Sequence, residues 1–128
     1  MVFLAEKTDA KAQPVRLDGL EFLNGLKVSG NSQVDFQLEG AWHKFGAEAG
    51  IGNSSAKDGT VRFQVWGDDR LLWDSGTVSP GTIIKPKLDI RGLSNLSLRT
   101  ITTDPELKMI WAEATVTGFV GNTVQSVN

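Results

Sequence analysis

Two tryptophans on predicted strands, Trp66 and Trp111, are the side chains best suited to bind a ligand by stacking. An indole face packs well against the C–H face of a sugar ring, and planar polar groups beside it can read the sugar hydroxyls. Gln64 shares the predicted face of Trp66, and Glu113 shares that of Trp111. In both strands the two-residue alternation turns the tryptophan away from the aliphatic face. The pattern therefore predicts two outward-facing stacking surfaces for a ligand, which we call platforms. The same pattern is also consistent with a tryptophan that covers a sheet edge or packs inside a strand buried on both faces.

Carboxylates in predicted turns are the groups that could hold a metal ion. Asp68 and Asp69 follow Gly67 in a turn, and Asp104 lies in a loop beside Pro105. Calcium in β-rich modules is held by carboxylates and carbonyls that converge from loops. The spacing of these three acids matches no calcium-binding motif, and turn geometry explains Asp68 and Asp69 without an ion. Calcium at these positions is kept as an alternative, and no other cofactor is expected.

The sequence contains no catalytic constellation. It has no cysteine, and no nucleophile motif surrounds its one histidine, His43. A single histidine without a thiol also argues against zinc. There is no glycine-rich phosphate loop, and no two carboxylates stand out as a glycosidase pair. The protein is therefore predicted to be non-catalytic.

Charge and hydropathy exclude two classes of partner. The chain has 13 Lys and Arg against 15 Asp and Glu, with a formal net charge of -2 and interspersed signs. Such a surface does not favour binding to nucleic acid or to an anionic membrane. The apolar runs are far shorter than the roughly 20 residues of a membrane helix. The run VFLA near the start is too short for a signal-peptide core.

Strands are the only elements that the hydropathy pattern predicts. Residues 59–76 have the form of a β-hairpin, with Val61, Phe63 and Val65 on one face and a turn at residues 67–69. A second tight turn is predicted at residues 24–25, an Asn-Gly dipeptide. About eight or nine short strands with glycine-rich turns and no amphipathic helix predict an all-β, antiparallel β-sandwich of jelly-roll type. The 128 residues form one predicted domain, in which residues 118–128 fray.

Four segments carry a resemblance to a known family: WHKFGAEAG from Trp42, VRFQVWGDDRLLWDSG from Val61, LDIRGLSNLSL from Leu88 and IWAEATVTG from Ile110. Their order and content resemble the NPCBM family of carbohydrate-binding modules, which occur beside glycoside hydrolases, and are similar to carbohydrate-binding module family 51. The family's Phe-x-Val, Ser-Gly, Leu-x-Leu and Trp-Ala patterns correspond here to Phe63 and Val65, Ser75 and Gly76, Leu96 and Leu98, and Trp111 and Ala112. The resemblance extends over nearly the whole chain, to about residue 118.

This resemblance implies a ligand or metal site in three loops, residues 25–31, 52–58 and 104–110. The chain departs from the family pattern in each loop. Lys27, Val28 and Ser29 stand where the family has a glycine followed by a histidine, and Gly52 and Asn53 replace an acidic pair. An Asp-His-Ala-Asp run is replaced by Leu107, Lys108, Met109 and Ile110. Lys27 and Asn53 are the polar residues that remain as binding candidates in these loops.

Two functions are consistent with the sequence. The first is a non-catalytic module that binds a glycan, for which the resemblance implies a terminal galactose, as an accessory to a glycoside hydrolase or a cell-surface protein. The resemblance then implies a secreted, periplasmic or cell-surface location, although the chain shows no signal peptide. The alternative is a structural or protein-interaction sandwich that has lost its sugar loops and acts in an assembly, as a homo-oligomer or beside a catalytic domain.

Overall fold

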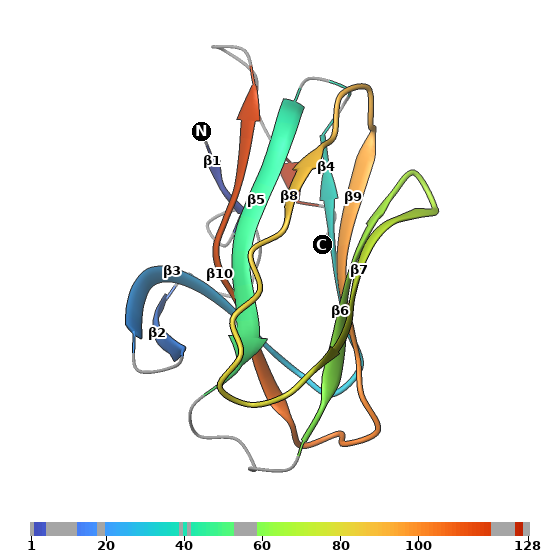
Figure 1. Ribbon diagram of the computed structural model, residues 1–128. Coiled ribbons are helices and arrows are strands. Elements are labelled where there is room, and N and C mark those ends of the chain that lie inside the picture. Colours follow the sequence, from blue (N-terminus) through green and yellow to red (C-terminus); the bar gives the residue numbers. More distant parts are fainter. Residues whose placement is uncertain are drawn as a thin grey trace.

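The computed structural model of the protein describes residues 2–4, 13–17, 20–38, 40, 42–52, 59–118 and 125–126, and these form two facing sheets (Figure 1). The first sheet has the order β2-β3-β10-β5-β8, with β1 paired to β10. Its strands are β1 (Val2–Phe3), β2 (Gln13–Leu17), β3 (Leu20–Ser29), β5 (Trp42–Ile51), β8 (Lys87–Asp89) and β10 (Lys108–Gly118). The second sheet has the order β11-β4-β9-β6-β7. Its strands are β4 (Ser32–Gln37), β6 (Val61–Gly67), β7 (Arg70–Val78), β9 (Asn95–Ile101) and β11 (Gln125–Ser126).

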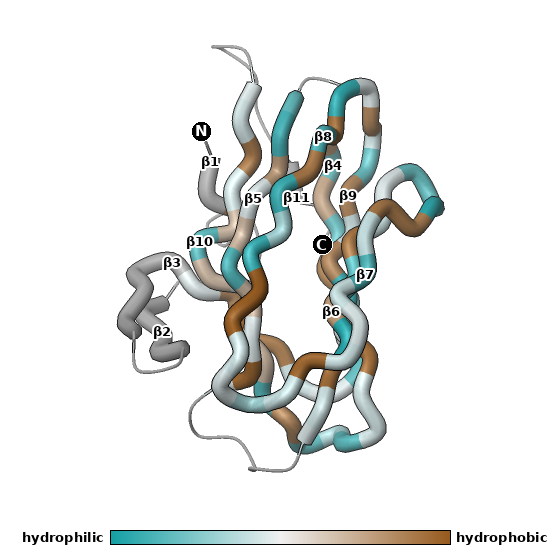
Figure 2. Tube along the Cα trace, viewed as in Figure 1, coloured by the Kyte–Doolittle hydropathy of each residue, from teal (hydrophilic) through white to brown (hydrophobic). Residues whose placement is uncertain are grey.

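The predicted antiparallel β-sandwich is confirmed. All the strand pairs in the described residues are antiparallel. Of their eleven strands, β1, β8 and β11 have only two or three residues, and the other eight have five or more. Hydrophobic and hydrophilic residues alternate along strands such as β9 (Figure 2). That alternation is expected where one sheet face meets a core and the other meets water.

The core lies between the two sheets and joins them through aromatic contacts. Phe63 on β6 and Trp111 on β10 are fully buried, and their rings meet edge to face with centroids 5.1 Å apart. Edge-to-face aromatic pairs add about 0.5–1.5 kcal/mol beyond the area that they bury. The aliphatic and aromatic side chains packed with them include Leu26, Phe36, Phe45, Val65, Leu96, Leu98, Met109 and Val116.

Two register shifts change which face of a strand is buried. On β10, one extra residue lies between Ala112 and Thr115 relative to β5, and Glu113 has φ of 51°. Trp111 faces the main core before this bulge, and Ala114 faces the same core after it. The prediction that Trp111 points outward is therefore wrong, because the bulge reverses the alternation within one strand.

The start of β5 contains the second shift. Trp42 pairs with Gly118 and Lys44 with Thr117, so His43 is an extra residue opposite β10. Trp42 is consequently buried in the core together with Phe45. A strict alternation would have placed these two side chains on opposite faces.

The two predicted turns have opposite outcomes. Asp68 and Asp69 connect β6 to β7 with φ of 48° and 65°, which is the type I′ geometry preferred in two-residue hairpins. The turn predicted at residues 24–25 is wrong, because β3 continues through it from Leu20 to Ser29. Gly25 pairs with Gln13 on one side and Ala112 on the other, so both neighbouring strands hold it extended.

The end of the chain is described only in part. Of the residues predicted to fray, Gly118 ends β10, and Gln125–Ser126 form β11 against Phe36 and Gln37. Residues 119–124 and 127–128 lie outside the described residues. Within the described residues, no helix has the length and hydropathy needed to cross a bilayer.

Candidate functional site

The outer face of the second sheet carries a polar hollow beside Trp66. Trp66 is partly exposed on β6, and its cross-strand partner on β9 is Ser97. The space beside it has a volume of about 200 Å³, and we call it the Trp66 hollow. Its lining comes from β4, β9 and the hairpin β6–β7, namely Gln33, Asp35, Trp66, Asp68, Asp69, Asn95, Ser97 and Arg99.

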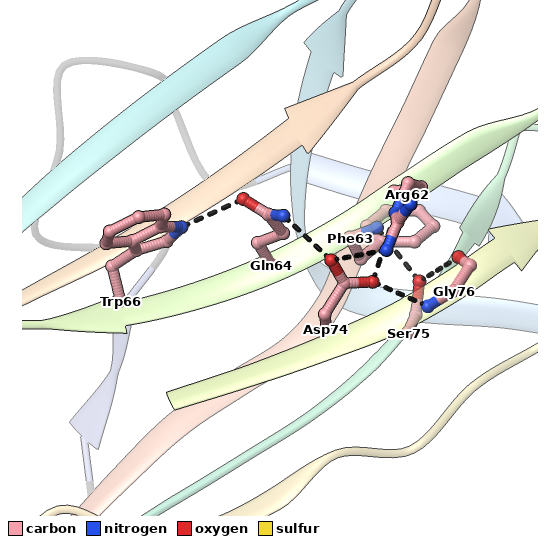
Figure 3. Close-up of polar contacts among 7 residues, drawn as sticks. All are labelled: Arg62, Phe63, Gln64, Trp66, Asp74, Ser75 and Gly76. Atoms are coloured by element: carbon pink, nitrogen blue, oxygen red, sulfur yellow. Dashed lines mark hydrogen bonds and ion pairs between the residues drawn. The ribbon is translucent and has the colours of Figure 1, made fainter. Parts of the chain in front are cut away.

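A chain of polar contacts fixes the orientation of the Trp66 ring (Figure 3). The indole Nε1 donates to Oε1 of Gln64 at 2.9 Å, and Nε2 of Gln64 donates to Oδ2 of Asp74 at 2.8 Å. Arg62 completes the chain by donating to both carboxylate oxygens of Asp74, at 3.2 and 3.0 Å. Rotation of the indole would break its hydrogen bond to Gln64. Asp74 on the neighbouring strand β7 keeps the Gln64 side chain in place.

Arg99 covers part of the same ring. Its guanidinium carbon lies 4.4 Å from the centroid of the Trp66 ring, within the range of a cation–π interaction. Its Nε donates to Oγ of Ser97 at 3.0 Å. The planar guanidinium carries five N–H donors, so it places further donors at the edge of the hollow. A ligand that contacts the indole there would also meet these donors.

The hydrogen bonds around Asp74 lower its pKa below the ordinary value of 3.8. Donation from Gln64 is the largest cause, and donation from the backbone N–H of Gly76, at 2.7 Å, is the next. Arg62 contributes both a hydrogen bond and its charge. A carboxyl group whose pKa is lowered on folding stabilises the folded state above its unfolded pKa. That stability is lost as the pH falls through the folded pKa.

The difference in melting temperature between the unmodified protein and Asp74→Asn should therefore depend on pH. We expect a constant difference at about pH 5 to 7, which narrows as the pH falls below the ordinary value of 3.8 and Asp74 becomes protonated. Thermal unfolding followed by circular dichroism measures it. Asp69→Asn, in the turn and outside these contacts, is the matched control. A difference that stays constant down to about pH 2 would contradict the role of the charged carboxylate.

The candidate metal ligands do not converge. Asp68 and Asp69 lie beyond the start of β9, where the Asp68 carboxylate accepts the backbone N–H groups of Ser94 and Asn95 at 3.1 and 2.9 Å. Asp104 lies beyond the other end of β9, and its carboxylate accepts the N–H of Glu106 at 2.9 Å. The described residues contain no group of three or more acidic, histidine or cysteine side chains placed to hold an ion.

The second predicted platform does not exist. The side chain of Trp111 is 0% exposed, so its ring cannot stack on a ligand at the surface. Glu113 is half-buried on β10 of the first sheet, in the bulge, whereas the Trp66 hollow lies on the second sheet. The structure therefore brings Gln64 to Trp66 but leaves Trp111 and Glu113 apart from both.

Residues 25–29 and 108–110, which were expected in loops, instead belong to β3 and β10, and the described parts of the three segments lie together at one end of the first sheet. The Lys108 Nζ donates to Oγ of Ser29 at 3.1 Å, and the Gly52 N–H donates to the Lys108 carbonyl at 2.9 Å. Lys27 is exposed and pairs with Ile110, and Asn53 lies outside the described residues. The side chains that stand where the family has Asp-His-Ala-Asp are largely aliphatic and buried: Leu107, Met109 and Ile110.

The sequence alone does not identify five residues of the Trp66 hollow as binding candidates: Gln33, Asp35, Asn95, Ser97 and Arg99. They occupy alternate positions on β4 and β9, and each is polar. The alternation of polar residues can be seen in the sequence, and it indicates the solvent-facing side of these two strands. The pairing of β9 with β6 was not visible, and only this pairing places Arg99 beside Trp66.

A family model, described as the NPCBM/NEW2 domain, matches residues 4–117. A search of curated protein sequences gives no match. Among solved structures, CBM51 from Clostridium perfringens GH95, in complex with methyl-galactose, is similar with a TM-score of 0.70 and 19% identity. The match covers 85% of this chain and 82% of that one.

Two structures from Clostridium perfringens ZmpB are similar over a smaller share of their own length. CBM51-2 with GlcNAc and the INT domains matches with a TM-score of 0.69 and 17% identity, over 88% of this chain and 26% of that one. The M60 catalytic domain with CBM51-1 and CBM51-2 matches with a TM-score of 0.70 and 20% identity, over 85% of this chain and 12% of that one. At such identities the likeness establishes a shared fold.

Proposed function

The chain belongs to the NPCBM/NEW2 family of carbohydrate-binding modules, and we propose that it binds a glycan at the Trp66 hollow without catalysing a reaction. One observation carries this assignment of the site. A partly exposed indole is held in a fixed orientation by Gln64, beside Arg99 and a set of hydrogen-bonding side chains. An aromatic surface next to convergent polar groups is the arrangement that sugar recognition requires.

The size of the hollow suits a short ligand. Its volume of about 200 Å³ is below the roughly 300–1,000 Å³ of sites that enclose drug-sized molecules. A terminal sugar ring fits this description better than a long stretch of polysaccharide. Because little surface is buried on such a ligand, binding is expected to be weak and to benefit from several copies of the sugar on one surface.

The charges at the hollow favour a neutral sugar. Asp35, Asp68 and Asp69 contribute three carboxylates against one guanidinium from Arg99, which gives a formal charge of -2. A sugar that carries its own carboxylate would be repelled there. The CBM51 structures with methyl-galactose and GlcNAc contain neutral sugars, and we propose galactose-terminated glycans as the first ligands to test.

A glycan array probed with the whole chain, at physiological ionic strength, tests this function. Neutral glycans that end in galactose or GlcNAc are expected to retain the protein, and the matching free sugar is expected to displace it. If no neutral glycan gave a signal above background, the proposal that this hollow binds a sugar would be wrong. A glycan-binding accessory role beside a catalytic domain, outside the cell, is the setting that we propose for this activity.

The end of the first sheet, where aliphatic side chains replace the polar residues of the family's loops, supports a second candidate function, a protein-interaction module. Leu107 and Ile110 are buried there, and Leu71 and Ile101 are exposed by 47% and 45% elsewhere on the surface. A sandwich that has exchanged sugar loops for aliphatic packing could act in an assembly. Size-exclusion chromatography with light scattering distinguishes the two functions. A stable oligomer together with a blank array would favour assembly, and a monomer at high concentration would count against self-assembly.

A further inference from the structure

The first sheet carries a separate hollow at its β8 edge. It has a volume of about 570 Å³, and residues of β5 and β8 line it together with Arg91. In the pairing of these strands, Lys44 lies opposite Asp89, and Gly46 lies opposite Lys87. We call this space the Gly46 hollow. It lies on the other sheet from the Trp66 hollow, so the two can be tested separately.

The absence of a side chain at position 46 leaves this surface open. On β5 the residues Phe45, Ala47 and Ala49 face the core, so Gly46 faces outward between Lys44 and Glu48. A Cβ atom at this position would meet only the Pro86 carbonyl oxygen, at 4.0 Å. A glycine inside a strand weakens the strand, and it is often found where a ligand or another chain approaches the backbone closely.

Two lysines that have no ion-pair partner among the described residues border this opening. Lys44 and Lys87 are exposed and line the hollow, and neither forms an ion pair within the described part of the chain. Lys85, two residues before Lys87, instead forms an ion pair with Glu48, with 3.6 Å between its Nζ and the Glu48 Oε1. Lys85 does not line the hollow. Two ammonium groups thus face the same space, and neither has a partner anion among the described residues.

Asp89 is the carboxylate in the described lining, and it forms an ion pair with Arg91. Arg91 donates to both oxygens of Asp89, with the shortest contact 2.7 Å. These bonds lower the pKa of Asp89 to about 2, and the nearby His43 contributes to the same effect. The formal charges of Asp89 and Arg91 cancel, so Lys44 and Lys87 leave the described lining with a formal charge of +2. The hollow therefore attracts anions, although the whole chain has a net charge of -2.

We propose that the Gly46 hollow is a second binding site, which takes an acidic saccharide whose carboxylate or sulfate group contacts Lys44 and Lys87. Its volume lies within the roughly 300–1,000 Å³ of small-molecule sites, far larger than one inorganic anion needs. That the ligand is a saccharide rests on the proposed function. The requirement for negative charge rests on the two lysines alone.

Isothermal titration with three oligosaccharides of equal length tests the proposal: an oligogalacturonate, a sulfated oligosaccharide and a neutral oligogalactoside. The whole chain is expected to bind at least one acidic oligosaccharide at physiological ionic strength, and a rise in salt should weaken that binding. The double variant Lys44→Gln and Lys87→Gln should reduce the affinity about tenfold, because it removes two charge-assisted contacts. Which acidic probe binds more tightly identifies the anionic group.

Matched variants separate this site from the Trp66 hollow. Arg70→Gln removes an exposed positive charge on the other sheet, outside the lining, and should leave acidic binding unchanged. Gly46→Val should block acidic binding without touching any charge, and its melting temperature reports whether it folds. Trp66→Ala should leave acidic binding unchanged while it weakens the binding of neutral glycans. Failure of the neutral array would thus overturn the proposed function but not this second site.

Three results would overturn the second site. The first is that neither acidic oligosaccharide binds. The second is that the variant at Lys44 and Lys87 binds acidic oligosaccharides as tightly as the unmodified chain. The third is that inorganic sulfate or monomeric galacturonate competes as well as the oligosaccharide at equal concentration, since the hollow would then bind only the anion.

Discussion

Replacing Trp66 with alanine is expected to lower the affinity for a neutral glycan by about ten- to hundredfold, which corresponds to about 1.4–2.8 kcal/mol. The substitution removes the apolar surface that a sugar ring would contact and leaves the Gln64 side-chain oxygen without its indole donor. It also removes the ring that Arg99 packs against. Large aromatic side chains commonly dominate the energy of small interfaces, so the loss should exceed that of any other single residue in the hollow.

The measurement is a titration of each variant with the glycan found on the array. Ile101→Ala is the matched control, because Ile101 is exposed at the far end of β9 and does not line the hollow. Gln64→Ala should give an intermediate loss, because it keeps the ring and removes the hydrogen bond that orients it. If Trp66→Ala bound the glycan as tightly as the Ile101→Ala control, the sugar site would have to lie elsewhere.

The second large effect concerns stability. Trp111→Ala should reduce the free energy of unfolding by about 3–5 kcal/mol, because the side chain is fully buried and its loss leaves a cavity between the two sheets. The contact with Phe63, which joins the sheets, is lost at the same time. A domain has only about 5–15 kcal/mol of stability in total, so this one substitution could leave the protein largely unfolded.

Trp111→Phe should cost much less than Trp111→Ala. The Nε1 atom of Trp111 is buried and has no hydrogen-bond partner in the described residues. A buried donor without a partner costs about 1–3 kcal/mol, so phenylalanine removes that penalty while it keeps a ring beside Phe63. Urea unfolding followed by circular dichroism compares the variants. Equal losses for phenylalanine and alanine would contradict this prediction, because the phenyl ring would then restore none of the packing lost with the indole.

Much of the fold could be predicted because an antiparallel sandwich leaves a local signature. Strand β6 alternates Val61, Phe63 and Val65 toward the core, and the tight turn at Asp68 and Asp69 follows it, as expected from the sequence. This signal is local, since each residue's face depends only on its neighbours along the strand. The same reasoning placed Gln64 beside Trp66.

The predictions that are wrong concern residues where the structure departs from this local alternation. The turn expected at residues 24–25 is absent, because pairing of Gly25 with strands on both sides outweighs the dipeptide's turn preference. The bulge at Glu113 adds one residue to β10, and Trp111 therefore faces the core rather than solvent. A bulge has no reliable sequence signal, since it is defined by the pairing of a strand with its neighbour.

The sequence by itself determined that the chain forms antiparallel strands, that it resembles one module family and that Trp66 has a polar neighbour on its own strand. Only the tertiary structure decided which tryptophan reaches the surface and what surrounds it. Arg99 meets Trp66 because β9 pairs with β6, and Lys87 meets Gly46 because β8 pairs with β5. Contacts between residues far apart in the sequence depend on strand order and register, and these are set by the packing of the whole core.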